Sequence, residues 1–317
     1  MNRLQPSVRG GDARSRDPGN ARRRLLGLAG AAVLGRAGGS VASEDAPDVK
    51  VPYVPTPWPV VAAMLELGEV GPRDLLIDLG SGDGRLVIEA ARARGARGLG
   101  VELDADLVQV SQSEARRLGV ADRVRFLRQD LFETDLTPAT VITLYLLPPV
   151  MMALRPRLAT GLAPGTRIVS HDFTLGDWVP DRGMKIDVPE KSYGPPYSTI
   201  HLWVVPAFVQ GRWQGRFGSG SAEQAWALDL QQQFQRVSGT MTVRGRTARI
   251  DSAELSGRRV VVAALIEGAG GRERHQFQGE VRAGLLEGHW RVEGAGASGK
   301  AVAVHVTRGE RPPAASR

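Results

Sequence analysis

The residues that could bind a ligand begin where an apolar run meets a glycine-rich segment. Leu75–Leu79 has the composition of a strand, glycines then alternate with other residues, and residues 86–94 favour a helix. Glycine lets the backbone turn sharply and a ligand approach closely, and the free N–H groups of a helix start suit an anionic group. A turn that needs glycine only for its geometry is the alternative. The candidate ligand-binding residues here are Asp78, Gly80, Ser81, Gly82 and Gly84.

Two further acids end the next two predicted strands. Glu102 closes the strand that begins at Leu99, and Asp130 closes the strand that begins at Arg123. A carboxylate about 20 residues after such a loop can accept both hydroxyls of a ribose, and Asp130 is well placed for an adenine amino group. A nicotinamide dinucleotide is disfavoured, because its G-x-G-x-x-G spacing needs a glycine where this chain has Arg85.

Charge is distributed unevenly along the chain. Residues 1–42 carry eight Arg against two Asp, and residues 211–317 carry sixteen Lys and Arg against ten acids. The overall +7 therefore leaves residues 43–210 with a net charge of −5. An acidic central region argues against a nucleic-acid groove around the candidate site. Cysteine is absent and the five His are scattered, so we expect no disulfide, cysteine nucleophile or metal site.

The first 42 residues have the features of a targeting segment. Arg22–Arg24 precedes an apolar run over residues 25–35 that is too short to span a bilayer comfortably. Ser40-Val41-Ala42 then supplies an A-x-A-like cleavage site. The arginines before Leu25 resemble a twin-arginine export signal. These features predict export or membrane tethering, and the alternative is a disordered basic leader on a cytoplasmic protein.

A proline-punctuated lead-in precedes the first predicted helix. Prolines at 52, 55 and 57 favour an extended chain. Thr56 is predicted to cap the helix, with Pro57 at its first position. Tyr53 and Thr56 could also close over a bound ligand beside the glycine loop. Simple packing of this segment on the sheet is the alternative.

Strands and helices alternate beyond the third predicted strand. Residues 139–147 form a continuously apolar strand, a helix follows through 158, and residues 166–173 form the next strand. Two closing strands over 184–188 and 198–205 complete a doubly wound, seven-stranded, mainly parallel sheet of α/β class. Ligands of such sheets lie outside the carboxyl ends of the strands. The residues expected at that edge are Asp78, Glu102, Asp130, Tyr145, His171 and Asp172.

Together, the glycine loop, Glu102 and Asp130 resemble the class I S-adenosylmethionine-dependent methyltransferases. Four segments narrow the resemblance to the lysine methyltransferases of the mitochondrial ATP synthase c-subunit and adenine nucleotide translocase, with their bacterial relatives. The segments are Tyr53–Pro57, Asp78–Arg85, Thr143–Pro148 and Ser170–Phe173. The similarity covers about residues 50–206. It implies S-adenosylmethionine as cofactor and protein-lysine N-methylation, with a membrane-associated protein as one possible substrate.

Methylation of lysine, which the resemblance implies, also suggests how the acceptor amine would be oriented and kept neutral. A lysine amine must arrive neutral although its free pKa is about 10.4, so alignment in a dry site is the main requirement. Tyr145 could orient the amine and Asp172 could accept its hydrogen, whereas His171 is more plausibly structural. A packed Tyr145 and a strand-capping Asp172 are the alternatives. The DNA amino-methyltransferase motif is missing, since residues 147–150 are Leu-Pro-Pro-Val.

From residue 211 the pattern changes to short alternating runs broken by Gly and polar turns. The seven runs are 226–230, 239–243, 247–250, 259–265, 275–281, 288–292 and 301–306. Such spacing predicts a small antiparallel all-β barrel or sandwich that could contact a partner. We therefore expect a leader over 1–42, a methyltransferase domain over 43–207, a β domain over 208–308 and a tail over 309–317.

Two other functions remain compatible with the sequence. One is methylation of a small molecule, because the motifs define the cofactor better than the acceptor. The other is an exported, non-catalytic nucleoside-binding protein with a β interaction domain. The sequence predicts no oligomeric state.

Overall fold

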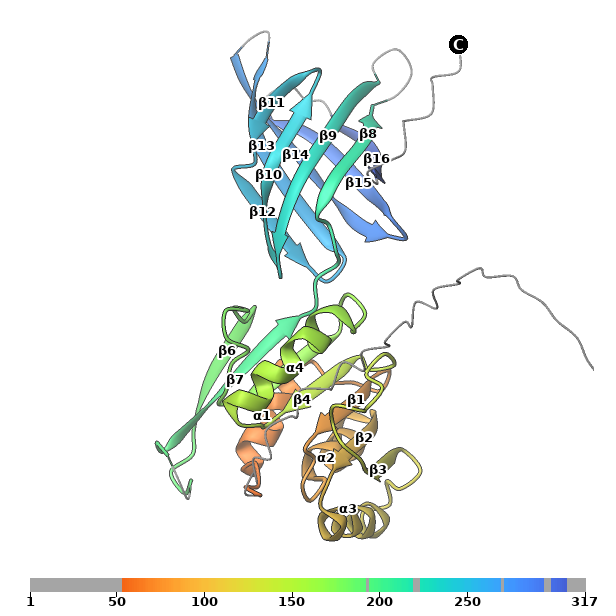
Figure 1. The fold of residues 1–317 in the computed structure, drawn as a ribbon, viewed down its shortest axis with the longest axis vertical. Helices are drawn as coiled ribbons and strands as arrows, with labels where there is room; N and C mark the ends of the chain where they lie inside the picture. Colours follow the sequence, from red (N-terminus) through yellow and green to blue (C-terminus); the bar gives the residue numbers. More distant parts are fainter. Residues whose placement is uncertain (1–52, 192–193, 219–222, 269–270, 294–297, 307–317) are drawn as a thin grey trace, which may run out of the picture. The chain divides into compact units, whose positions relative to one another are not determined.

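The computed structural model describes residues 53–191, 194–218, 223–268, 271–293 and 298–306. Within these ranges the strands form two separate sheets (Figure 1). The predicted leader over 1–42 and the tail over 309–317 lie outside the described residues. No helix in the described ranges combines the length and apolarity that a bilayer crossing needs.

The first sheet contains seven strands in the order β3-β2-β1-β4-β5-β7-β6. Strands β1 to β5 pair in parallel, while β7 runs antiparallel to both β5 and β6. This is the doubly wound, mainly parallel sheet that the alternating pattern predicted. Its elements are α1 (Trp58–Leu67), β1 (Leu75–Leu79), α2 (Arg85–Arg94), β2 (Arg97–Glu102), α3 (Ala105–Arg117), β3 (Val124–Arg128), β4 (Val141–Leu144), α4 (Pro148–Thr160), β5 (Arg167–His171), β6 (Arg182–Asp187) and β7 (Tyr197–Val204).

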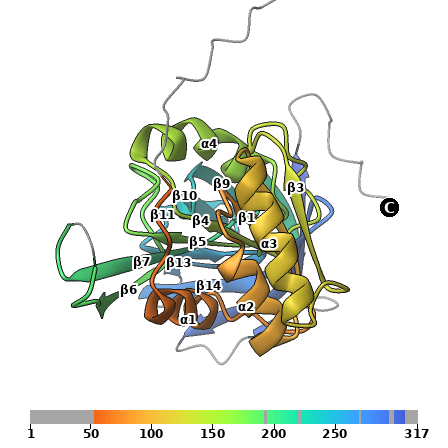
Figure 2. The same ribbon diagram turned by 90° about the horizontal axis from the view of Figure 1, so that it is seen from below.

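Helices cover both faces of this sheet (Figure 2). One apolar cluster joins α1, α2 and α3 to residues such as Leu76 and Val169. A second cluster on the opposite face joins Leu154 and its neighbours in α4 to Ile77 and Ile142. All four residues of β4 are buried, as expected of a central parallel strand covered on two sides.

The start of α1 differs from the sequence-based expectation. The helix begins at Trp58, Pro57 occupies the N-cap position, and no side chain caps the free N–H groups. Thr56 therefore does not cap the helix, and that prediction was wrong. Its Oγ1 instead lies 3.5 Å from Nδ1 of His171, more than 100 residues further along the chain. In the folded protein the Thr56 hydroxyl contacts His171, whereas the local sequence predicted that it would cap α1.

The second sheet is antiparallel and has nine strands in the order β11-β10-β9-β8-β16-β15-β14-β13-β12. Two strands, β8 and β12, were missing from the predicted runs. β12 buries little apolar surface, so alternation is weak there. The strands are β8 (Gly211–Phe217), β9 (Gln224–Gln233), β10 (Arg236–Val243), β11 (Arg246–Arg249), β12 (Ser252–Ser256), β13 (Arg259–Gly268), β14 (Gly271–Arg282), β15 (Leu285–Glu293) and β16 (Ser298–Val306).

Aromatic side chains form the centre of the second sheet's core. Trp290 stacks on Phe217 with 4.6 Å between ring centroids, and Trp226 lies 5.2 Å from Phe277. These rings belong to one buried cluster to which most strands of the sheet contribute. Each ring buries a large apolar area, so these aromatic side chains supply much of the core of the second sheet.

The packing of α4 on the first sheet, and with it the stability of the protein, should depend on the buried leucines of this helix. Leu154 is fully buried against the first sheet, so Leu154→Ala should leave a cavity and lower the free energy of unfolding by about 2–5 kcal/mol. Met152→Ala, on the exposed side of the same helix, is the control and should change it by less than about 1 kcal/mol. Urea unfolding followed by circular dichroism measures both. Equal effects of the two substitutions would contradict the packing described for α4.

Candidate functional site

The glycine loop joins β1 to α2 and is bound to the neighbouring strand. Gly80, Gly82 and Gly84 all have positive φ, at 78°, 54° and 77°. The N–H of Gly80 and the N–H of residue 81 both donate to the carbonyl of Val101, at 2.9 and 3.0 Å. A Cβ at Gly82 would lie 2.5 Å from the ring of Tyr53. The loop therefore needs glycine both for its turns and for close approach.

Glu102 connects the end of β2 to this loop. Its Oε2 accepts a hydrogen bond from the Gly82 N–H at 2.9 Å, and its Oε1 accepts one from Leu103 at 2.8 Å. Asp130 lies just beyond the end of β3 at Arg128, where the N–H of Gln129 donates to the Glu102 carbonyl at 3.1 Å. The structure thus brings the loop and the two predicted acids together at one edge of the sheet.

Asp78 is a buried acid at the same edge. Its side chain is only 6% exposed, and Thr143 on β4 donates a hydrogen bond to its Oδ1 at 2.7 Å. Burial raises the pKa of Asp78 to about 7, with the nearby charges of Glu102 and Asp83 adding to the effect. A cation close to this carboxyl would favour its ionised form.

Two other predicted residues, Tyr53 and Ser81, lie at the glycine loop and have different surroundings. The ring of Tyr53 lies directly against Gly82. Ser81 is buried, and among the described residues its Oγ has no hydrogen-bond partner. Gly100 on β2 is its close neighbour, since a Cβ there would lie 2.7 Å from that Oγ. Ser81 therefore faces the strand, with its backbone forming the loop.

A second group of side chains lies at the carboxyl ends of β4 and β5. The ring of Tyr145 stacks on His171, with 3.9 Å between centroids. His171 is fully buried, and its Nε2 lies 2.8 Å from Oγ of Ser198. Burial lowers the pKa of His171 to about 4, with the Lys191 ammonium acting in the same direction and the Asp172 carboxylate opposing. The imidazole is therefore neutral at physiological pH, consistent with the structural part that the sequence favoured.

Asp172 lies at the tip of β5 in a backbone conformation unusual for a non-glycine residue, with φ of 61°. Its Oδ1 accepts a hydrogen bond from the N–H of Thr199 at 2.9 Å. Its Oδ2 forms an ion pair with Nζ of Lys191 at 2.6 Å. The predicted acceptor carboxylate thus already holds a lysine ammonium of the same chain.

Sequence reasoning missed three residues of the site. Arg85 forms an ion pair with Asp83 at 2.6 Å and donates to the Thr56 carbonyl, which joins the lead-in to the loop. Thr143, which entered the sequence-based prediction only as the start of the segment Thr143–Pro148 and with no role, is the register partner of Asp78 across β1 and β4. Lys191 lies 19 residues from its partner. Only the Arg85 contact has a local sequence signal, the Asp83-x-Arg85 spacing.

The arrangement at the glycine loop fits a nucleoside cofactor that carries a positive charge. Glu102 and Asp130 can accept hydrogen bonds from ribose hydroxyls and an adenine amino group. The buried Asp78 can balance a cation, and Gly82 offers a side-chain-free approach. In the described ranges no cluster of three or more His, Asp or Glu could hold a metal ion.

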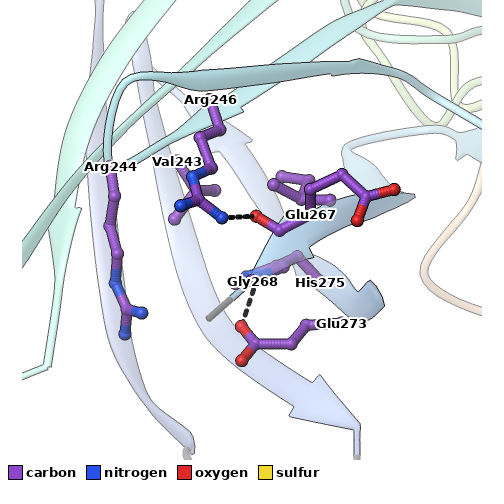
Figure 3. A pocket seen from close by; sticks show the side chains of 8 residues that line it. Val243, Arg244, Arg246, Glu267, Gly268, Glu273 and His275 are labelled. Carbon is purple, nitrogen blue, oxygen red and sulfur yellow. Dashed lines mark hydrogen bonds and ion pairs between the residues drawn. The ribbon is translucent and has the colours of Figure 1, made fainter. Parts of the chain in front are cut away.

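A separate hollow of about 180 Å³ lies on the second sheet (Figure 3). Its polar residues contact one another. His275 Nε2 lies 3.3 Å from Glu273, and its Nδ1 accepts a hydrogen bond from Trp290. Arg246 donates to the carbonyl of Glu267. The Trp290 contact joins β15 to β14, the Arg246 contact joins β11 to β13, and the Glu273 contact lies within β14. These contacts are a structural explanation for the charged side chains there.

Comparison with known proteins identifies the family. The family profile described as "ANTKMT methyltransferase domain" matches residues 78–182. A protein-lysine N-methyltransferase of Saccharolobus islandicus is 37% identical over 156 residues, which is 49% of this chain and 94% of that protein. The chain therefore belongs to this family of protein-lysine N-methyltransferases.

Other relatives match over a smaller part of their length. The ATP synthase c-subunit lysine N-methyltransferase of Xenopus laevis and the adenine nucleotide translocase lysine N-methyltransferase of Mus musculus are each 34% identical, over 41% and 42% of this chain. The chain spans 57% of each of them. A Salinibacter ruber structure described as an RNA methyltransferase with S-adenosyl-L-homocysteine is 52% identical, with a TM-score of 0.45 over 49% of this chain and 96% of that one.

The buried Asp78 should make stability depend on pH. Its pKa rises from 3.8 to about 7 on folding, so its contribution to stability is complete below about pH 4 and is lost as the pH rises to about 7. Asp78→Asn should therefore exceed the wild type in unfolding free energy by an amount that grows over this range and levels off at about 2–4 kcal/mol.

Urea unfolding at a series of pH values measures the difference. The same substitution at exposed Asp122 is the matched control. A difference between Asp78→Asn and wild type that stays constant from pH 4 to pH 8 would show that Asp78 is not buried as described.

Proposed function

We propose that the chain is an S-adenosylmethionine-dependent enzyme that methylates the Nζ atom of lysine in a protein substrate. The observation that carries this proposal is the contact between Glu102 Oε2 and the Gly82 N–H. It places the acid of β2 directly on the glycine loop, beside Asp130. Family membership adds the acceptor, because the relatives are named as lysine methyltransferases.

The nucleoside end and the methionine end of the cofactor would contact different residues at the carboxyl edge of the first sheet. Glu102 would bind the ribose hydroxyls and Asp130 the adenine amino group. Asp78 would balance the positive charge of the methionine end, with Gly80, Gly82 and Tyr53 around it. Ser81 and Gly84 would contribute through the loop's backbone. Thr56 would support the site indirectly, because its Oγ1 contacts the ring of His171.

The bound cofactor supplies an electrophilic methyl group, and the chain aligns the amine with it. In the transfer the methyl carbon–sulfur bond breaks as the carbon–nitrogen bond forms. Tyr145, held against the buried His171 ring, would orient the neutral amine. Asp172 would accept a hydrogen from it, and the proton leaves toward solvent through this carboxylate. Burial beside the His171 ring favours an uncharged amine, whereas the Asp172 carboxylate favours the ammonium. The acceptor would therefore dock on Asp172 as the ammonium and lose its proton to solvent before the transfer.

Cofactor binding can be tested directly by titration calorimetry with S-adenosylmethionine and S-adenosylhomocysteine. Glu102→Gln keeps the size of the side chain and removes its charge. It should weaken binding by about tenfold or more, the expected loss for a charged hydrogen-bond partner. Glu114→Gln on the exposed surface of α3 is the control. A folded wild type that binds neither compound would overturn the proposal.

The acceptor can be identified with a methyl-labelled cofactor and a cell lysate. Label that survives ribonuclease, disappears with protease and appears on lysine in mass spectra would support protein-lysine methylation. Label in the small-molecule fraction would favour the alternative acceptor class, and label lost with ribonuclease would point to RNA. The Glu102→Gln variant should label at a correspondingly lower rate at limiting cofactor.

We also propose that residues 1–42 export the chain or tether it to a membrane, where a membrane-associated substrate would be close. Support comes from Arg22–Arg24, the apolar run after it and the small residues up to Ala42. Cell fractionation with N-terminal sequencing of the mature chain tests this, with Arg22 and Arg23 changed to Lys as the comparison. A full-length chain found only in the cytoplasm would contradict it.

For the C-terminal sheet, we propose closure into a barrel. The first and last strands of the sheet order come together, since β11 packs against β13 and β10 against β12. Between β11 and β12, the N–H of Ile250 donates to the Gly239 carbonyl of β10 at 3.0 Å and the N–H of Asp251 donates to the Ala263 carbonyl of β13 at 2.9 Å. This segment thus bonds to strands near both ends of the sheet order. Closure would protect edge strands that otherwise expose unpaired backbone groups.

A further inference from the structure

The most unusual pair near the acceptor end is Lys191 with Asp172. The Lys191 side chain is only 3% exposed, although lysine is rarely buried. Its Nζ contacts Asp172 Oδ2 at 2.6 Å and donates a hydrogen bond to the carbonyl of Tyr197 at 3.1 Å. The ammonium is therefore held in a fixed place at the tip of β5.

The neighbours of this pair connect it to the proposed methyl-transfer site. Asp172 Oδ2 also lies 3.4 Å from Nε2 of His171. The His171 ring stacks on Tyr145 at the end of β4. A chain of contacts thus runs from the ring that would orient the acceptor amine to the carboxylate that Lys191 occupies.

The occupant has the chemistry of the substrate. If the proposed function is right, the enzyme must receive a lysine side chain ending in the same amine. A carboxylate that binds one lysine ammonium at 2.6 Å offers the same acceptor oxygen to another ammonium. Asp172 remains 20% exposed, so an incoming amine can reach it from solvent.

We propose that Lys191 is an internal competitor that occupies the docking carboxylate of the acceptor lysine, so that substrate binds by displacing it from Asp172. This inference rests on the proposed function. A tethered group competes at a high effective concentration. The substrate's apparent affinity is therefore lowered by the fraction of enzyme in which Asp172 is held by Lys191. Lys191 thus favours substrates that make further contacts over isolated lysines.

The first test uses n-butylamine as a minimal acceptor and measures KM and kcat separately. Lys191→Met removes the ammonium at nearly constant length, so the KM for n-butylamine should fall about tenfold or more with kcat little changed. Lys191→Arg returns a cation to Asp172 and should raise KM toward the wild-type value. Lys185→Met is the matched control, because Lys185 lies on β6 of the same hairpin, over the Tyr197 ring.

A folded Lys191→Met protein that binds S-adenosylhomocysteine normally but shows an unchanged or higher KM would overturn the competitor model. Such a result would make the ion pair a structural anchor.

The second test needs no variant and covers the case in which Lys191→Met does not fold. The wild type is acetylated with acetic anhydride, and mass spectrometry compares the modification rates of Lys191 and Lys185. Adding n-butylamine and S-adenosylhomocysteine should raise the Lys191-to-Lys185 ratio several-fold, since a displaced side chain becomes accessible. The ratio corrects for reagent consumed by the amine. An unchanged ratio at amine concentrations above KM would overturn the inference.

These results are distinguishable from failure of the proposed function. A wild type that binds no cofactor and methylates no amine would overturn the proposed function itself. A wild type that methylates n-butylamine, with Lys191 still protected during turnover, would overturn only the role of Lys191.

Discussion

The hydrogen bond from the Gly82 N–H to Glu102 is the contact on which the candidate site depends. It joins the turn after β1 to the end of β2, and neither element could form the site alone. Parallel pairing brings both strand ends to one edge of the sheet, and positive φ at three glycines lets the turn fold back onto β2. Asp78 and Asp130 reach the same edge because Asp78 lies near the carboxyl end of β1 and Asp130 lies just beyond the carboxyl end of β3.

Burial determines the chemistry along this edge. Asp78 lies under the loop with a pKa near neutrality, a state that costs stability when the carboxyl ionises and that a bound cation would relieve. Burial has the opposite effect on the pKa of His171, which it lowers, so the imidazole is neutral. Its ring stacks on Tyr145. A site of this kind suits transfer of a methyl group to an amine, which requires an uncharged nucleophile more than a strong base.

The carboxyl end of β5 carries an ion pair between Asp172 and Lys191, which belong to separate parts of the chain. Asp172 is held by the backbone of β7 on one oxygen and by Lys191 on the other. Both oxygens of Asp172 are engaged, so in the proposed competition an incoming amine takes the place of Lys191 on Oδ2. That competition would couple substrate binding to the connection between β6 and β7.

The seven-stranded sheet, the glycine loop and the acids near the strand ends could be predicted from the residues alone, because period, glycine spacing and strand length are local properties. The second, antiparallel sheet was also predicted, although its weakly alternating strands β8 and β12 were not. The partners of side chains far apart in the chain could be found only from the folded structure. Thr56 contacts His171 rather than capping α1, and Lys191 occupies Asp172. Such pairings depend on strand order and on the path of the connection before β7, and no local pattern encodes either.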